Sequence, residues 1–227
     1  MRLLNFSLAV CTIVAILFSG AHASAKNPFK GLLSSSKESK EPKKTDNLPE
    51  QLYEMTLDEN LNALKTGKQA DKIRDYQKKQ ALAFKKKGYK TEVMRNGEIV
   101  IISIPATDLF VASDSAMIRL ADQRLSPFVK LMESPDFYRT ILVMNSDNTG
   151  SDNYKLSLTK VRVQAVMNWF DAHGANTDYV VPYAVGDKNP ITDNNSISHR
   201  ALNRRLEVYL VPGTAMIDAA KKNNLRL

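Results

Sequence analysis

The sequence of 227 residues predicts an α/β protein, in the form of a two-layer α+β sandwich with two main helices on a mixed sheet. Short β-prone runs are bounded by turn residues, and two long segments between them carry apolar residues at helical spacing. These elements follow one another in the order ββαβαββ, and further helices precede them. We therefore expect the helices to cover one face of the sheet.

Residues 1–25 have the pattern of a secretory signal peptide. Arg2 gives a positive start, residues 3–18 are mostly apolar, and small residues in A-x-A spacing end at Ala23 and Ala25. An uncleaved N-terminal anchor is the alternative. In either case the chain is expected to be exported, and the manner of any membrane association is open.

The net charge bears on the kind of partner that the protein binds, and the cysteine and histidine content bears on disulfides and metal sites. The formal net charge is +8, or +7 once Arg2 leaves with the signal peptide. For an exported chain we expect no nucleic acid, and anionic envelope polymers or a membrane surface are candidates; a solvated basic surface without a partner is the alternative. Cys11 is the sole cysteine, so the mature chain has no thiol. His173 and His199 lie far apart, and no metal or cofactor is expected.

Two segments precede the predicted sheet. Residues 26–49 are rich in Lys, Ser, Glu and Pro and predict a flexible linker, because they bury too little apolar surface to offset the entropy of ordering. Residues 50–88 predict a helical extension with a break at Thr66-Gly67. Its second helix ends at Lys85-Lys-Lys-Gly88. Those lysines either complement the helix dipole or contact a membrane surface.

The sheet is predicted to begin with a hairpin. The β-prone runs 89–94 and 98–104 flank Arg95-Asn96-Gly97, in which Asn-Gly is a strong signal for a short hairpin turn. The second run is almost continuously apolar, as in a strand with neighbours on both sides, and Pro105 ends it. The remaining predicted elements are a helix from Asp114 or Ser115 to Ser134, a strand at 140–144, a helix from Ser151 or Asp152 to His173, strands at 179–184 and 206–211, and a tail at 214–227 with room for a short helix.

The helix after the turn at 146–151 carries a charge on its apolar face. Steps of about 100° per residue place Leu158 and Val166 within about 60° of Arg162. A guanidinium in such a place is costly unless it is paired and hydrogen-bonded. Asp147 is the nearest carboxylate upstream. Arg162 is therefore either a structural partner of Asp147 or is held for a ligand.

Four segments together carry a family resemblance. They are residues 146–151, 158–162, 186–190 and 200–207. In order and spacing they resemble G-H-T-D-x-x-G-S, L-S-x-x-R-A, G-x-G-x-x-x-P and G-R-x-x-N-R-R-V-E of the OmpA-like C-terminal domain, a family that includes peptidoglycan-associated lipoproteins and flagellar stator proteins. The resemblance implies an OmpA-like domain over residues 89–213.

The resemblance also implies a non-enzymatic protein of the periplasm, or of the periplasmic face of the outer membrane, that binds the diaminopimelate of peptidoglycan stem peptides. Asp147 would take the ligand's ammonium and Arg162 its carboxylate, through a planar fork suited to bidentate pairing. One of the two adjacent arginines, 204 and 205, would brace a loop and the other would form a pocket wall. The implied ligand-binding residues are Asp147, Arg162, Ser146, Arg204 and the backbone N–H groups near Phe110 and Val111.

Two departures from the family pattern motivate an alternative function. Asn145 stands where the family has His, and His199 stands where it has Gly. A protein that keeps the fold but has lost peptidoglycan binding, and serves as a structural or interaction protein, is the alternative. In both cases the N-terminal helices could contact another envelope protein. No catalytic constellation is present in the sequence, so an enzyme is not expected.

Overall fold

The structure is a computed structural model and describes residues 55–62 and 66–227. The predicted signal peptide (1–25) and linker (26–49) lie outside the described residues. None of the helices in the described part of the chain is both long enough and apolar enough to cross a membrane.

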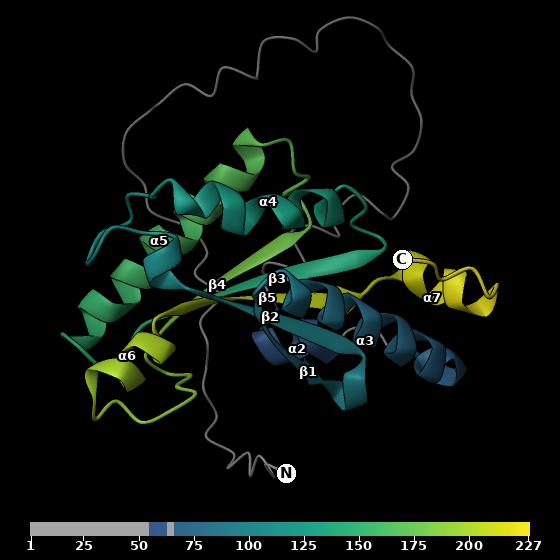
Figure 1. The fold of residues 1–227 in the computed structure, drawn as a ribbon, viewed down its shortest axis with the longest axis horizontal. Helices are drawn as coiled ribbons and strands as arrows, with labels where there is room; N and C mark the ends of the chain where they lie inside the picture. The colour runs from purple at the N-terminus through teal and green to yellow at the C-terminus, as the bar shows by residue number, and fades with distance from the viewer. Residues whose placement is uncertain (1–54, 63–65) are drawn as a thin grey trace, which may run out of the picture.

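The described chain contains one five-stranded sheet with the order β1-β2-β5-β3-β4 (Figure 1). Pairing is antiparallel from β1 through β2 and β5 to β3, and parallel between β3 and β4. The predicted mixed sheet is confirmed. The strands are β1 (Lys90–Met94), β2 (Ile99–Pro105), β3 (Tyr138–Asn145), β4 (Val180–Gly186) and β5 (Arg205–Pro212).

The two predicted main helices are α4 and α5, and they occupy the predicted places in the order ββαβαββ. One short helix, α6, was not predicted; Ser196 begins it by accepting a hydrogen bond from the N–H of His199 at 3.1 Å. It lies between the predicted strands at 179–184 and 206–211. The helices are α2 (Leu57–Asn62), α3 (Ala70–Lys86), α4 (Leu120–Met132), α5 (Asp152–Ala172), α6 (Ile197–Asn203) and α7 (Thr214–Lys221).

A large hydrophobic core fills the space between one face of the sheet and helices α3, α4, α5 and α7. Phe84, Phe128 and Phe170 are among its largest members, and the Phe84 and Phe128 rings stack with centroids 4.9 Å apart. A smaller cluster on the opposite face packs Leu61 of α2 against Ile141 and Val143 of β3. Helix α3 thus shares the main core with the predicted domain.

The hairpin between β1 and β2 is one residue longer than the predicted connection at residues 95–97. Met94 and Ile99 form the last cross-strand pair, so four residues make the loop. Arg95, Asn96 and Gly97 all have left-handed backbone, with φ of 50°, 56° and 97°. Asn and Gly adopt this conformation at low cost, and the Arg95 side chain is held there by the Leu61 carbonyl at 2.7 Å.

The start of α4 also corrects a prediction. Asp114 does accept the next two backbone N–H groups, at 2.6 and 3.1 Å, as a helix cap would. The chain then pairs Met117 with Phe110 in an antiparallel bridge, and the helix begins only at Leu120. A local capping signal was overridden by pairing within the 109–118 loop.

Replacing Gly213 by alanine is expected to destabilise the fold by about 1–3 kcal/mol, the usual cost of overpacking. A Cβ at this position would lie 2.0 Å from the carbonyl oxygen of Asp136, which is backbone and cannot rotate away. Urea unfolding would measure the change, with the exposed Thr214→Ala as control. Equal free energies of unfolding for the two variants would show that the backbone of residues 136–137 can shift to admit the methyl group without loss of stability.

Candidate functional site

The candidate site begins at the turn that links β3 to α5. Ser146 donates its N–H to the Gly186 carbonyl at 2.8 Å, which joins the turn to the end of β4. Asp147 accepts the N–H of Thr149 on Oδ1 at 2.9 Å. Ser151 begins α5 by accepting the N–H of Tyr154 at 3.2 Å, as predicted. These hydrogen bonds hold the turn to the end of β4 and orient the Asp147 carboxylate.

Arg162 enters the site from α5 and is 4% exposed, which confirms that it lies on the buried face of this helix. Its Nε donates to the Asp114 carbonyl at 2.8 Å, and Nη2 donates to the Val111 carbonyl at 3.3 Å. The guanidinium carbon lies 5.0 Å from the centre of the Phe110 ring. Burial lowers the pKa of Arg162, but an arginine side chain remains charged at neutral pH.

Asp147 pairs with Arg204, not with Arg162. Burial pushes the pKa of Asp147 upward, but the Thr149 N–H and the Arg204 guanidinium outweigh burial and hold that pKa below its usual range. Among the described residues, no carboxylate lies within ion-pair distance of Arg162. The alternative of a structural Asp147–Arg162 pair is therefore not what the structure shows.

A cavity of about 340 Å³ brings together all six residues that the sequence analysis named: Phe110, Val111, Ser146, Asp147, Arg162 and Arg204. Thr149, Tyr154, Lys155 and Leu158 also line it. Tyr154, Leu158 and Arg162 stand four residues apart, so helical spacing was the signal that could have placed Tyr154 beside Arg162. Lys155 offered no comparable signal.

The backbone N–H groups of Phe110 and Val111 correct one expectation. Phe110 donates to the Ala106 carbonyl and Val111 to the Ala116 carbonyl, each at 2.9 Å. Neither N–H group is thus available to a carboxylate. Ala112 and Ser113 follow in the same loop and also line the cavity, and their N–H groups have no acceptor among the described residues.

Lys155 is buried beside the cavity, but its charge is satisfied. Its Nζ contacts Asp187 at 2.6 Å and Asp152 at 2.7 Å, and these two carboxylates raise the pKa of the lysine. This contact ties the first turn of α5 to the residue that follows β4. Arg162 is consequently the cavity cation that lacks a carboxylate partner in the described part of the chain.

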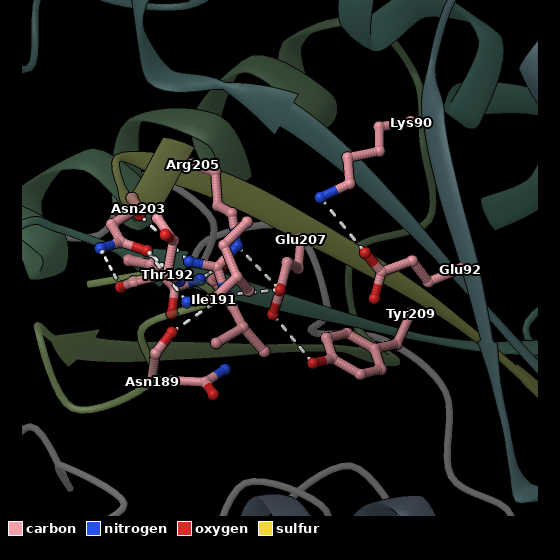
Figure 2. Close-up of polar contacts among 11 residues, drawn as sticks. Lys90, Glu92, Asn189, Ile191, Thr192, Asn203, Arg205, Glu207 and Tyr209 are labelled. Atoms are coloured by element: carbon pink, nitrogen blue, oxygen red, sulfur yellow. Dashed lines mark hydrogen bonds and ion pairs between the residues drawn. The ribbon is translucent and has the colours of Figure 1, made fainter. Parts of the chain in front are cut away.

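Arg204 lines the cavity, whereas its neighbour Arg205 does not. Figure 2 shows Arg205 among its polar partners on β5 and in the loop that follows β4. Arg205 is 2% exposed and donates to Glu207 Oε1 from both Nε and Nη2, at 2.9 and 2.6 Å. It also donates to the carbonyls of Asn203 and Asn189, at 3.1 and 3.0 Å. The loop from β4 to α6 is thereby fastened to β5.

The two departures from the family pattern lie outside the cavity lining. Asn145 is buried and donates to the Val143 carbonyl at 3.1 Å, and its Oδ1 has no hydrogen-bond partner among the described atoms. His199 lies in α6 and contacts Asp193. Within residues 55–62 and 66–227, no three His, Asp or Glu side chains gather as metal ligands would.

No protein-family model matches the chain. The peptidoglycan-binding protein ArfA of Mycobacterium tuberculosis is 33% identical over 81 residues, which are 36% of this chain and 24% of that protein. Outer membrane protein A of Bordetella avium is 28% identical over 89 residues, 39% of this chain and 46% of that protein. The chain thus matches less than half the length of either relative.

A solved structure agrees with the architecture. The crystal structure of a putative MotB-like protein from Desulfovibrio vulgaris superposes with a TM-score of 0.57 at 18% identity, covering 65% of this chain and 95% of that one. The chain therefore has the mixed α/β fold of OmpA-like and MotB-like domains, in a diverged form.

Proposed function

We propose that this protein binds peptidoglycan without catalysing a reaction, by holding the diaminopimelate of the stem peptide between Asp147 and Arg162. The observation that carries the proposal is the buried Arg162 guanidinium, which faces a cavity and has no carboxylate partner among the described residues. Burying a charge without an ionic partner costs free energy, and a ligand carboxylate would supply that partner. The similarity to a protein named for peptidoglycan binding supports the same function.

The chemistry of the cavity suits a zwitterion. Arg162 offers a planar set of donors for a carboxylate, and the Ala112 and Ser113 N–H groups could add donors on the same side. Asp147 and the Ser146 hydroxyl offer acceptors for an ammonium. The free end of diaminopimelate in a stem peptide carries one carboxylate and one ammonium on the same carbon. A protein that holds this group would be fastened to the cell wall, in the periplasm or at the periplasmic face of the outer membrane.

The proposal is tested by titrating the purified protein with meso-diaminopimelate and by co-sedimentation with purified peptidoglycan. The wild type is expected to bind both. Asp147→Asn should weaken binding by about tenfold or more, because it removes the charge opposite the ammonium. Asp171→Asn, at the exposed far end of α5, is the matched control. Equal sedimentation of the wild type and Asp147→Asn would reject this site. No binding by the wild type would favour a structural or interaction role.

A further inference from the structure

Resting on the proposed function, we infer that Arg204 is a competing counter-ion: it occupies the position of the ligand's ammonium on Asp147 and is displaced when the zwitterion binds. The family resemblance implied that Arg204 binds the ligand. The geometry assigns Arg204 the role of a competitor, because its guanidinium already contacts the Asp147 carboxylate that the ligand's ammonium would bind. Affinity is then set by an exchange of one cation for another.

The carboxylate of Asp147 is arranged for such an exchange. Oδ1 accepts a hydrogen bond from the Thr149 N–H at 2.9 Å, and Oδ2 accepts one from Nη1 of Arg204. Departure of Arg204 would leave the Thr149 bond in place, so the carboxylate keeps its orientation. Oδ2 alone changes partner, and a ligand's ammonium can replace the guanidinium there without any rearrangement of the turn.

Arg204 can leave by rotation of its side chain alone. Its backbone N–H donates to the Arg200 carbonyl at 3.1 Å, and its carbonyl accepts the Ala106 N–H at 2.9 Å. The next residue, Arg205, is fastened by the network shown in Figure 2. The Arg204 side chain, by contrast, is 32% exposed and can reach solvent. A flexible cation on a fixed backbone is suited to displacement.

The charges in the cavity favour displacement over a shared complex. Arg162 and Arg204 line the same cavity with like charges, and after burial the Arg204 charge contributes to lowering the pKa of Arg162. A ligand that brings an ammonium while Arg204 remains would place three cations around one carboxylate of the protein and one of the ligand. Because the zwitterion is neutral, departure of Arg204 leaves two cations, Arg162 and the ammonium, matched by two carboxylates, those of Asp147 and the ligand.

Arg204→Gln tests the inference, with meso-diaminopimelate and pimelate as the two probes in calorimetric titrations. Removal of the competitor should tighten diaminopimelate binding by about fivefold, which corresponds to the upper range for ion pairs that reach solvent. Pimelate has carboxylates but no ammonium, so its binding should stay equal or weaken. Arg200→Gln, a half-buried arginine of α6 that does not line the cavity, is the control and should change neither. Thermal melting verifies that each variant is folded.

Weaker diaminopimelate binding by Arg204→Gln, or tighter binding of both probes, would overturn the inference and return Arg204 to the role of a direct ligand contact or a steric wall. Unchanged binding would also overturn it. Failure of the proposed function looks different: neither the wild type nor Arg204→Gln would then bind diaminopimelate. Binding by Arg204→Gln where the wild type shows none would support the counter-ion role of Arg204 and reject the proposed function of the wild type.

Discussion

Replacing Glu207 by alanine is expected to lower the free energy of unfolding by about 3–5 kcal/mol, the cost of leaving one member of a buried ion pair alone. Glu207 is 5% exposed on the strand between β2 and β3. Its Oε1 accepts two donors from Arg205, and its Oε2 accepts the Tyr209 hydroxyl at 2.9 Å. The substitution would leave the buried Arg205 guanidinium without its carboxylate partner and the buried Tyr209 hydroxyl without its acceptor.

Urea unfolding at neutral pH measures this loss, and an unchanged dependence on urea would show that the unfolded state is the same. Glu92→Ala is the matched control, because Glu92 also contacts a basic residue, Lys90 at 3.2 Å, but both side chains are more than half exposed (Figure 2). Its effect should stay within about 1 kcal/mol. The double substitution Arg205→Met with Glu207→Leu should recover much of the stability, since apolar replacement of a whole buried pair is often neutral. Equal losses for Glu207→Ala and Glu92→Ala would contradict the assignment of a buried, bracing pair.

Replacing Arg162 by methionine should abolish most binding of diaminopimelate while leaving the fold almost as stable. Loss of one partner of a desolvated charge pair weakens binding by about 2–5 kcal/mol, or about 30-fold at least. The stability should change by less than about 1.5 kcal/mol, because the lost bonds to the Asp114 and Val111 carbonyls are offset by removal of a costly buried charge.

Calorimetric titration and urea unfolding, run on the same preparations, separate these two effects. Arg139→Met is the control: Arg139 is half-buried on β3, burial lowers its pKa as it does for Arg162, and it contacts Asn60 away from the cavity. This control should bind as the wild type does. A large loss of stability with little change in binding would identify Arg162 as a structural residue instead.

The elements of the fold were largely predictable because their signals are local. The apolar runs of β2 and β3 and the Ser151 cap of α5 depend on neighbouring residues, and each appears where the pattern predicted it. The failures arose where distant contacts compete with local preference. Asp114 has the capping bonds of a helix start, yet pairing of Met117 with Phe110 delays α4. The β1–β2 loop is longer than Asn96-Gly97 suggests because three successive residues take left-handed backbone.

The same division holds for the candidate site. Helical periodicity was sufficient to place Arg162 on a buried face, because the direction of a side chain around a helix follows from residue spacing. The identity of the partner of Asp147 was not accessible in this way. Arg204 is 57 residues away and reaches Asp147 only because β5 lies beside β3 in the sheet. The sequence thus indicated Asp147, Arg162 and Arg204 as charges of the site but not Lys155. Tertiary structure decided which of these charges pair, because ion pairing depends on distances in space that strand order sets.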